Sequence, residues 1–108
     1  FWATWCAPCL RELPLLDRFQ REQTARGWQV VGLAVDSPTP VREFLLKRPL
    51  GFPVGLAGLD GVDLARSLGN EAGGLPFSVA IDAEGQARGR KLGALHDEDL
   101  AGWARLVG

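Results

Sequence analysis

Apolar residues along this chain switch between helical and strand spacing. Between residues 10 and 27, leucines and a phenylalanine recur every three or four positions, which predicts a helix that ends near Gly27. Pro14 interrupts this pattern, and we expect it to bend the helix because proline removes one helical hydrogen bond. Residues 28–35 are almost continuously apolar, which is typical of a strand buried on both faces of a parallel sheet.

The second half of the chain repeats this alternation in shorter pieces. Three further helices are expected where apolar stripes follow or precede capping residues: 40–48 after Thr39, 61–68 before Gly69, and from 97 onward. Three strands are expected between them: 52–56, 79–81 and 87–92, the last two as an antiparallel hairpin. Pro53 places the first of these strands at a sheet edge. The pattern therefore predicts an α/β fold with a mixed sheet.

Composition narrows the classes of function. A chain of 108 residues forms one domain and buries roughly 65% of its unfolded surface, so it needs no disulfide to hold a core. Its 12 basic and 13 acidic residues are interspersed, which argues against a nucleic-acid or membrane-surface partner and favours proteins or small thiols. The chain lacks methionine and opens on what looks like the end of a strand. We therefore expect a single domain over residues 1–108 that is N-terminally incomplete, with any signal or membrane anchor outside it.

The only two cysteines, Cys6 and Cys9, lie three positions apart at the start of the first predicted helix. Residues at this spacing share a helix face, and a small adjustment brings their Cβ atoms to the ~3.8 Å that a disulfide prefers. Pro8 suits the first helical turn, where its missing N–H costs nothing. The pair can therefore close and reopen, which points to reversible redox chemistry rather than to a static bridge.

The two sulfurs are expected to play different roles. Cys6 lies at the helix start, where free N–H groups and the helix dipole stabilise a thiolate, so it is the predicted nucleophile. Cys9 lies one turn inside the helix and is the predicted resolving thiol. Two alternatives stay open, a structural disulfide and half of a metal site. The second would need further ligands, which the single histidine can hardly supply, so we expect no metal and no cofactor beyond the disulfide.

The segments FWATWCAPC, at residues 1–9, and GLPFSVAID, at residues 74–82, together with the order of elements, resemble the thioredoxin fold. More narrowly they resemble the TlpA/ResA-like thiol:disulfide oxidoreductases of the redoxin family. The resemblance implies a three-layer thioredoxin-like fold, with a mixed central sheet flanked by helices and the N-terminal strand or strands missing from this chain.

The same resemblance assigns further site residues. It implies that Pro76 is cis and that the backbone of Leu75 pairs with an extended substrate, while Trp5 flanks the reactive sulfur and contacts substrates. It also places Glu12 as the group that takes a proton from Cys9, and one helical turn brings a carboxylate within reach for this. The alternative for Glu12 is an ordinary solvated glutamate. Asp36 ends a predicted strand on the side where α/β folds bind ligands, but nothing in the sequence brings it to the cysteines.

By resemblance, the chain reduces protein disulfides in the bacterial envelope, in the periplasm or anchored to the membrane facing it. Apocytochrome c would be one client, and a membrane thiol protein would be the upstream electron donor. A thiol peroxidase of the peroxiredoxin type is the rival enzyme, although the Thr-x-x-Cys spacing is absent because Thr4 lies only two residues before Cys6. A non-catalytic thioredoxin-fold binding module is the third hypothesis.

Overall fold

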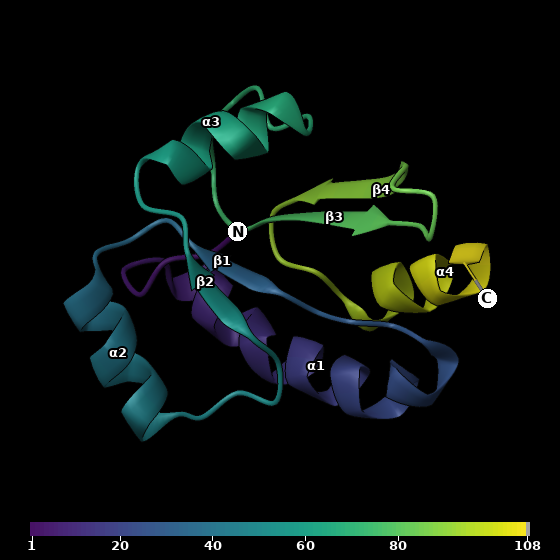
Figure 1. Cartoon of the computed structure of the whole chain (residues 1–108), viewed down its shortest axis with the longest axis horizontal. Helices are drawn as coiled ribbons and strands as arrows, with labels where there is room; N and C mark the ends of the chain where they lie inside the picture. The colour runs from purple at the N-terminus through teal and green to yellow at the C-terminus, as the bar shows by residue number, and fades with distance from the viewer. Residues whose placement is uncertain (108) are drawn as a thin grey trace.

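The structure is a computed structural model that describes residues 1–107, and helices and strands alternate along it (Figure 1). In chain order the elements are α1 (Ala7–Gln23), the short 3-10 helix η1 (Thr24–Arg26), β1 (Gly32–Ala34), α2 (Pro38–Lys47), β2 (Val54–Leu56), α3 (Asp60–Ser67), β3 (Phe77–Ile81), β4 (Ala87–Leu92) and α4 (Asp97–Val107). Within the described residues, none of these helices is long and apolar enough to cross a bilayer. The predicted α/β class is confirmed.

The strands form two ribbons that meet at the first two residues of the chain. β1 and β2 pair in parallel, and β3 and β4 pair antiparallel. Trp2 forms a parallel bridge with Ala34 of β1. On the other side, the N–H of Phe77 in β3 donates to the carbonyl oxygen of Phe1 at 3.2 Å. The N-terminus accordingly lies between the ribbons in Figure 1, and the mixed sheet is continuous only through Phe1 and Trp2.

Beyond these two residues, a groove of about 680 Å³ separates residues 30–33 from β3. The strand predicted over residues 28–35 is therefore shorter than expected, because only Gly32–Ala34 pairs with a neighbouring strand. Val31 is 55% exposed, and the N–H of Val30 donates to Oε1 of Gln20 at 2.6 Å instead of entering a sheet ladder. The expectation of burial on both faces was wrong for the first half of this segment.

The start of α2 also differs from the expectation. The helix begins at Pro38 with Ser37 as its N-cap, two residues before the predicted start at Pro40 with Thr39 as the cap. Pro38 has the same fixed φ as Pro40 and suits a first turn equally well. The carboxylate of Asp36 accepts a hydrogen bond from the Ser37 N–H at 2.7 Å, which holds the backbone where the helix begins.

The remaining elements lie close to their predicted positions. α1 continues through Pro14, and η1 ends at Arg26, followed by Gly27, whose φ of 88° closes the helix as expected. α3 starts and ends one residue earlier than predicted, and Gly69 follows it with a positive φ. β2 lies at the edge of its ribbon, and β3 begins two residues before the predicted strand, at Phe77.

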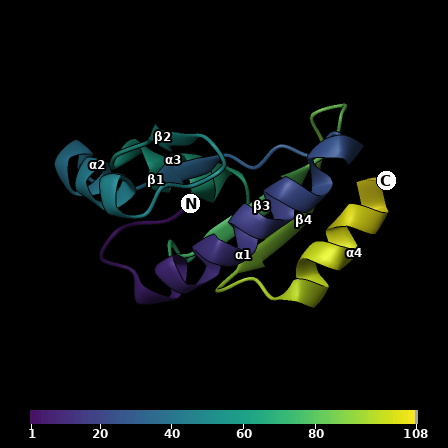
Figure 2. The same ribbon diagram turned by 90° about the horizontal axis from the view of Figure 1, so that it is seen from below.

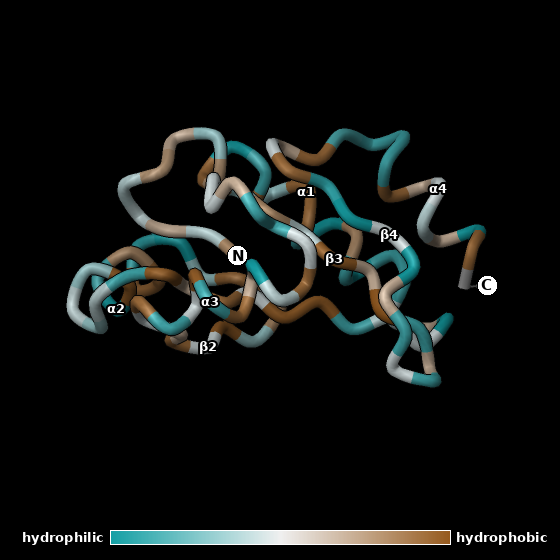
Figure 3. The backbone as a smooth tube through the Cα atoms, turned by 90° about the horizontal axis from the view of Figure 1, so that it is seen from above, coloured by the Kyte–Doolittle hydropathy of each residue, from teal (hydrophilic) through white to brown (hydrophobic). Residues whose placement is uncertain are grey.

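Two apolar clusters hold the layers together. α1 and α4 lie side by side on one face of the β3–β4 ribbon (Figure 2), and Phe19 of α1 packs there with Leu95, Leu100 and Ala104. The second cluster surrounds β1 and contains both cysteines with Trp2. β3 is coloured as largely hydrophobic and β4 as largely hydrophilic in Figure 3, in agreement with the alternating burial of β4. The disulfide is thus built into a core cluster.

Gly89 of β4 is required by the close approach of α4. A Cβ atom at this position would lie 2.7 Å from Cε2 of Trp103, and a ring cannot yield as a flexible chain end would. Gly89→Ala should lower the free energy of unfolding by about 1–3 kcal/mol, measured by urea denaturation. Gly102→Ala is the matched control, because its Cβ meets only Arg105 Nη2 at 3.9 Å. This helical substitution should raise stability by about 0.5–1 kcal/mol, and equal losses in both variants would contradict the packing argument.

Candidate active site

Cys6 and Cys9 form a disulfide at the N-terminus of α1, with their Cα atoms 5.3 Å apart. Cys6 is the N-cap residue and has an extended backbone, and Pro8 lies in the first turn, as its fixed φ favours. The backbone N–H of Cys9 donates a hydrogen bond to Sγ of Cys6 at 3.3 Å. The sulfur of Cys6 thus takes the place of a capping oxygen, where the helix N-terminus favours negative charge.

The two sulfurs differ in burial. Cys6 keeps 7% of its surface exposed, whereas Cys9 is fully buried. When the bridge is reduced, an incoming disulfide can therefore approach Cys6 and not Cys9. This difference agrees with the assignment of Cys6 as the attacking sulfur, and the assignment itself stays a prediction.

The turn that precedes β3 reaches the same cluster. The Leu75–Pro76 peptide bond is cis, as the resemblance implied, and Pro76 is fully buried. Leu75 packs against the cluster that contains both cysteines. On the outer side of the cysteine loop, the indole of Trp5 is 69% exposed. Trp5 and Leu75 both line one groove, so the structure brings the two predicted substrate contacts together.

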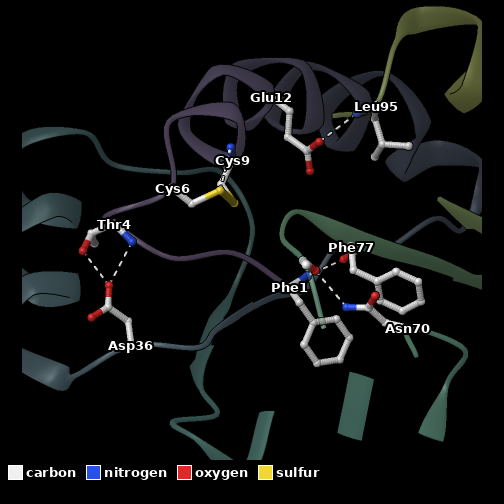
Figure 4. The surroundings of a disulfide bond; sticks show 10 residues. Phe1, Thr4, Cys6, Cys9, Glu12, Asp36, Asn70, Phe77 and Leu95 are labelled. Carbon is white, nitrogen blue, oxygen red and sulfur yellow. Dashed lines mark hydrogen bonds between the residues drawn. A yellow bond between two sulfur atoms is a disulfide. The ribbon is translucent and has the colours of Figure 1, made fainter. Parts of the chain in front are cut away.

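Glu12 is buried and is not a solvated surface residue, so the alternative of an exposed glutamate was wrong. Its side chain is only 5% exposed, and its Oε2 accepts a hydrogen bond from the N–H of Leu95 at 2.8 Å. Burial raises the pKa of Glu12 above its ordinary value, and the Leu95 hydrogen bond opposes this only in part. Figure 4 shows Glu12 one turn along α1 from Cys9, on the same side of the helix.

Asp36 is a site residue whose contact the sequence did not reveal. Its Oδ2 accepts hydrogen bonds from the N–H of Thr4 at 2.8 Å and from the Thr4 hydroxyl at 2.5 Å. These bonds tie the end of β1 to the loop that carries Trp5 and Cys6 (Figure 4). The position of Asp36 after a strand was the available signal, but a partner 32 residues away leaves no trace in local spacing.

Asn70 is a second residue that sequence reasoning missed. It is 3% exposed, and its Nδ2 donates to the carbonyl oxygen of Gly74 at 2.8 Å. This bond fixes the turn that leads into Leu75 and the cis peptide. Nothing in the local sequence distinguishes Asn70 from an ordinary polar residue after a helix.

Taken together, the arrangement is suited to thiol–disulfide exchange. The two sulfurs form a disulfide, and the one at the helix N-cap, Cys6, keeps a small part of its surface exposed. A buried carboxylate lies one helical turn further along, and an apolar groove adjoins the site. Among residues 1–107, no three side chains of the His, Cys, Asp or Glu type gather in a group that could hold a metal ion.

Comparison with known proteins places this geometry in a family. The sequence profile of the Redoxin family matches residues 1–104, and the chain belongs to that family. It is 29% identical over 108 residues to the thiol-disulfide oxidoreductase ResA of Bacillus thuringiensis (strain Al Hakam), covering 99% of this chain and 60% of the relative. The chain thus spans about 60% of the length of these curated relatives.

Solved structures agree on the fold. A thioredoxin-related protein from Neisseria meningitidis serogroup B superposes with a TM-score of 0.81 at 28% identity, covering 98% of this chain and 79% of that one. A thiol:disulfide interchange protein of the thioredoxin family from Chlorobium tepidum TLS superposes with a TM-score of 0.82 at 29% identity, covering 99% of this chain and 75% of that one. The predicted thioredoxin-like fold and the TlpA/ResA-like resemblance are therefore confirmed.

Proposed function

We propose that this chain is a thiol:disulfide oxidoreductase that acts through the Cys6–Cys9 couple. The observation that carries the proposal is the position of Cys6 Sγ at the helix cap, where it accepts a hydrogen bond from the Cys9 N–H at 3.3 Å. That hydrogen bond and the helix dipole favour the thiolate over the thiol. Membership of the Redoxin family and the names of the ResA relatives support the same reaction.

Reduction of a substrate would proceed in two exchanges. The Cys6 thiolate attacks one sulfur of the substrate disulfide, so a Cys6–substrate bond forms, the substrate bond breaks, and the leaving sulfur takes a proton from solvent. Cys9 then gives up its proton, with Glu12 as the acceptor, and attacks Cys6. The Cys6–Cys9 bond closes, the bond between Cys6 and the substrate breaks, and the second substrate sulfur leaves as a thiolate that takes a proton from solvent, while Glu12 returns its proton to solvent. Two electrons and two protons have passed to the substrate.

In this proposal the protein works mainly as a reductant. The residues between the cysteines, Ala7 and Pro8, carry no charge that would stabilise the reduced form further. By family resemblance, the compartment is the bacterial envelope, either the periplasm or its membrane surface, and a membrane thiol protein re-reduces the bridge. Apocytochrome c is the proposed client, since its haem-attachment cysteines must be reduced before ligation. No cofactor other than the disulfide takes part, and no nucleic acid is a partner.

Cys9→Ser should trap substrates as mixed disulfides on Cys6, because the sulfur that resolves the intermediate is absent. Mass spectrometry of the trapped adducts would identify the client. Cys6→Ser is the matched control and should trap nothing, since Cys9 is fully buried. Adducts on Cys9 in that control, or none on Cys6 in Cys9→Ser, would contradict the assigned roles.

Two other results would favour the rival hypotheses. Rapid peroxide consumption by the unmodified chain would favour the peroxidase. A cellular phenotype that Cys6→Ser leaves unchanged would favour the non-catalytic binding module.

The direction of electron flow follows from the reduction potential of the couple. Equilibrium titration against glutathione should give a value near the ~−270 mV of thioredoxin rather than the ~−120 mV of the strong oxidant DsbA. A value near the oxidant would reverse the direction while leaving the exchange chemistry in place.

Glu12→Gln should slow the resolving step by roughly 100-fold, the lower end of general base catalysis. The carboxylate form is the base, so in the unmodified chain the resolving rate should rise with pH as Glu12 ionises, at a pH above that of an ordinary glutamate because burial raises its pKa. In Glu12→Gln this rise should be lost, leaving only the ionisation of the thiol at higher pH. Stopped-flow measurement of the second exchange across pH tests this.

Glu22→Gln provides the control for removing a carboxylate from the same helix. The Glu22 side chain is 62% exposed and pairs only loosely with Arg18, at 4.0 Å, so its loss should leave the resolving rate unchanged. If Glu12→Gln showed the unmodified pH profile, Glu12 would serve only as the acceptor for the Leu95 N–H.

A further inference from the structure

A hollow of about 500 Å³ is lined by residues next to the active site, and the exchange chemistry does not explain it. Trp5 and Leu75 line it on the side of the active site, and Leu59 and Val62 line it from α3 and the residue before it. We call it the Trp5–Leu59 groove. Its volume falls within the ~300–1,000 Å³ of ligand sites, and it is large enough for a long side chain with water around it.

The walls of the Trp5–Leu59 groove are apolar and uncovered. Leu59 is 87% exposed and Trp5 is 69% exposed, which makes them two of the most exposed large apolar side chains among the described residues. Single exposed leucines are common on protein surfaces, but two large apolar groups converging on one hollow suit an apolar ligand segment. The groove is continuous with the residues that flank Cys6 and the cis peptide.

The groove carries negative charge, because Asp36 is the one charged residue among the described residues that line it. Asp36 lines it, and although partial burial works to raise the pKa of Asp36, the bonds from Thr4 and Ser37 outweigh this and hold the pKa below its ordinary value. Asn70 also lines the groove, but its Oδ1 is buried from solvent and its Nδ2 is bonded to Gly74, so Asp36 is the charged acceptor that the groove offers.

Within the described residues, no cation of the chain neutralises the Asp36 carboxylate. The lining residues include no lysine, arginine or histidine, and within the described residues Asp36 enters no ion pair. A ligand that complements the groove would therefore bring an apolar stem and a positively charged head. Lysine and arginine side chains have this form, since their methylene stems lie on apolar surface while the head reaches polar groups. The exposed indole of Trp5 can also face such a cation.

We propose that the Trp5–Leu59 groove is a specificity subsite that receives a lysine or arginine next to the reacting cysteine of a protein substrate. This inference rests on the proposed function, because the cationic residue is delivered to the groove only when its neighbouring disulfide meets Cys6. The stem lies against Leu59 and Val62, and the head pairs with the carboxylate of Asp36. An acidic residue at the same place meets the Asp36 carboxylate and is repelled.

The test uses disulfide peptides that differ at one position. Lysine, norleucine or glutamate is placed immediately before the reacting cysteine in one set and immediately after it in a second. The readout is the second-order rate constant for oxidation of the reduced chain, followed by tryptophan fluorescence. In at least one set, lysine should exceed glutamate by about tenfold with norleucine between them, and salt should narrow the difference. Equal rate constants for all three peptides in both sets would overturn the subsite.

Variants that change the charge at the groove test whether the preference for lysine arises there. Leu59→Lys should reduce the preference for lysine to about twofold or less, and Leu59→Glu should enlarge it, because the new charge lies at the groove and Leu59 contributes little to the core. Asp36→Asn, which keeps an oxygen for Thr4, should also reduce it. Leu46→Lys is the matched control, since Leu46 on α2 is 78% exposed and does not line the groove. A change of preference in Leu46→Lys as large as in Leu59→Lys would assign the effect to net charge and overturn the subsite.

A neutral disulfide, hydroxyethyl disulfide, separates the two proposals. If the reduced chain reduces it and also discriminates among the peptides, both proposals stand. If it reduces hydroxyethyl disulfide but treats the peptides alike, only the subsite fails. If it reduces neither hydroxyethyl disulfide nor the peptides, the proposed oxidoreductase function fails, and the subsite fails with it.

Discussion

The hydrogen bond from the Cys9 N–H to Cys6 Sγ is the interaction on which the rest of the site depends. It exists only because α1 begins at Ala7 and leaves Cys6 as an extended cap. The loop before it is held from both sides, since the Cys6 N–H donates to the carbonyl oxygen of Ala3 at 3.2 Å and Asp36 binds Thr4. A reactive thiolate needs this fixed geometry, because the field of a helix terminus falls off within one turn.

The proposed roles of the two sulfurs follow from their difference in burial. The packing that seals Cys9 inside a core cluster also encloses Glu12, and an isolated carboxylate in such a place is costly. The Leu95 N–H offsets part of that cost and explains how α1 and the segment before α4 tolerate the carboxylate. A glutamate kept in an apolar setting has a raised pKa, and it is therefore a stronger base toward a neighbouring thiol than a surface glutamate would be.

In the proposed function, the thiol–disulfide exchange and the recognition of the substrate take place on different parts of the chain. The sulfurs belong to the start of α1, whereas the Trp5–Leu59 groove is assembled from the cysteine loop, the residues after β1, the region of α3 and the turn before β3. Asn70 and Asp36 each anchor one of these segments by a hydrogen bond, to Gly74 and to Thr4. In the proposed function, recognition could vary through α3 and its flanking loops without disturbing the helix cap at Cys6.

Local sequence was sufficient for the Cys6–Cys9 disulfide, the cap at Cys6 and most helix and strand positions, because capping, proline and short spacings act over a few residues. The cis peptide before Pro76 followed from the family resemblance. Local sequence was insufficient for the half-paired segment 28–35, whose state depends on which strands lie beside it. It also could not show that Glu12 is buried or that Asp36 reaches Thr4, since these contacts join residues 83 and 32 positions apart. Only packing decides which polar groups lose water, and packing is a property of the folded chain as a whole.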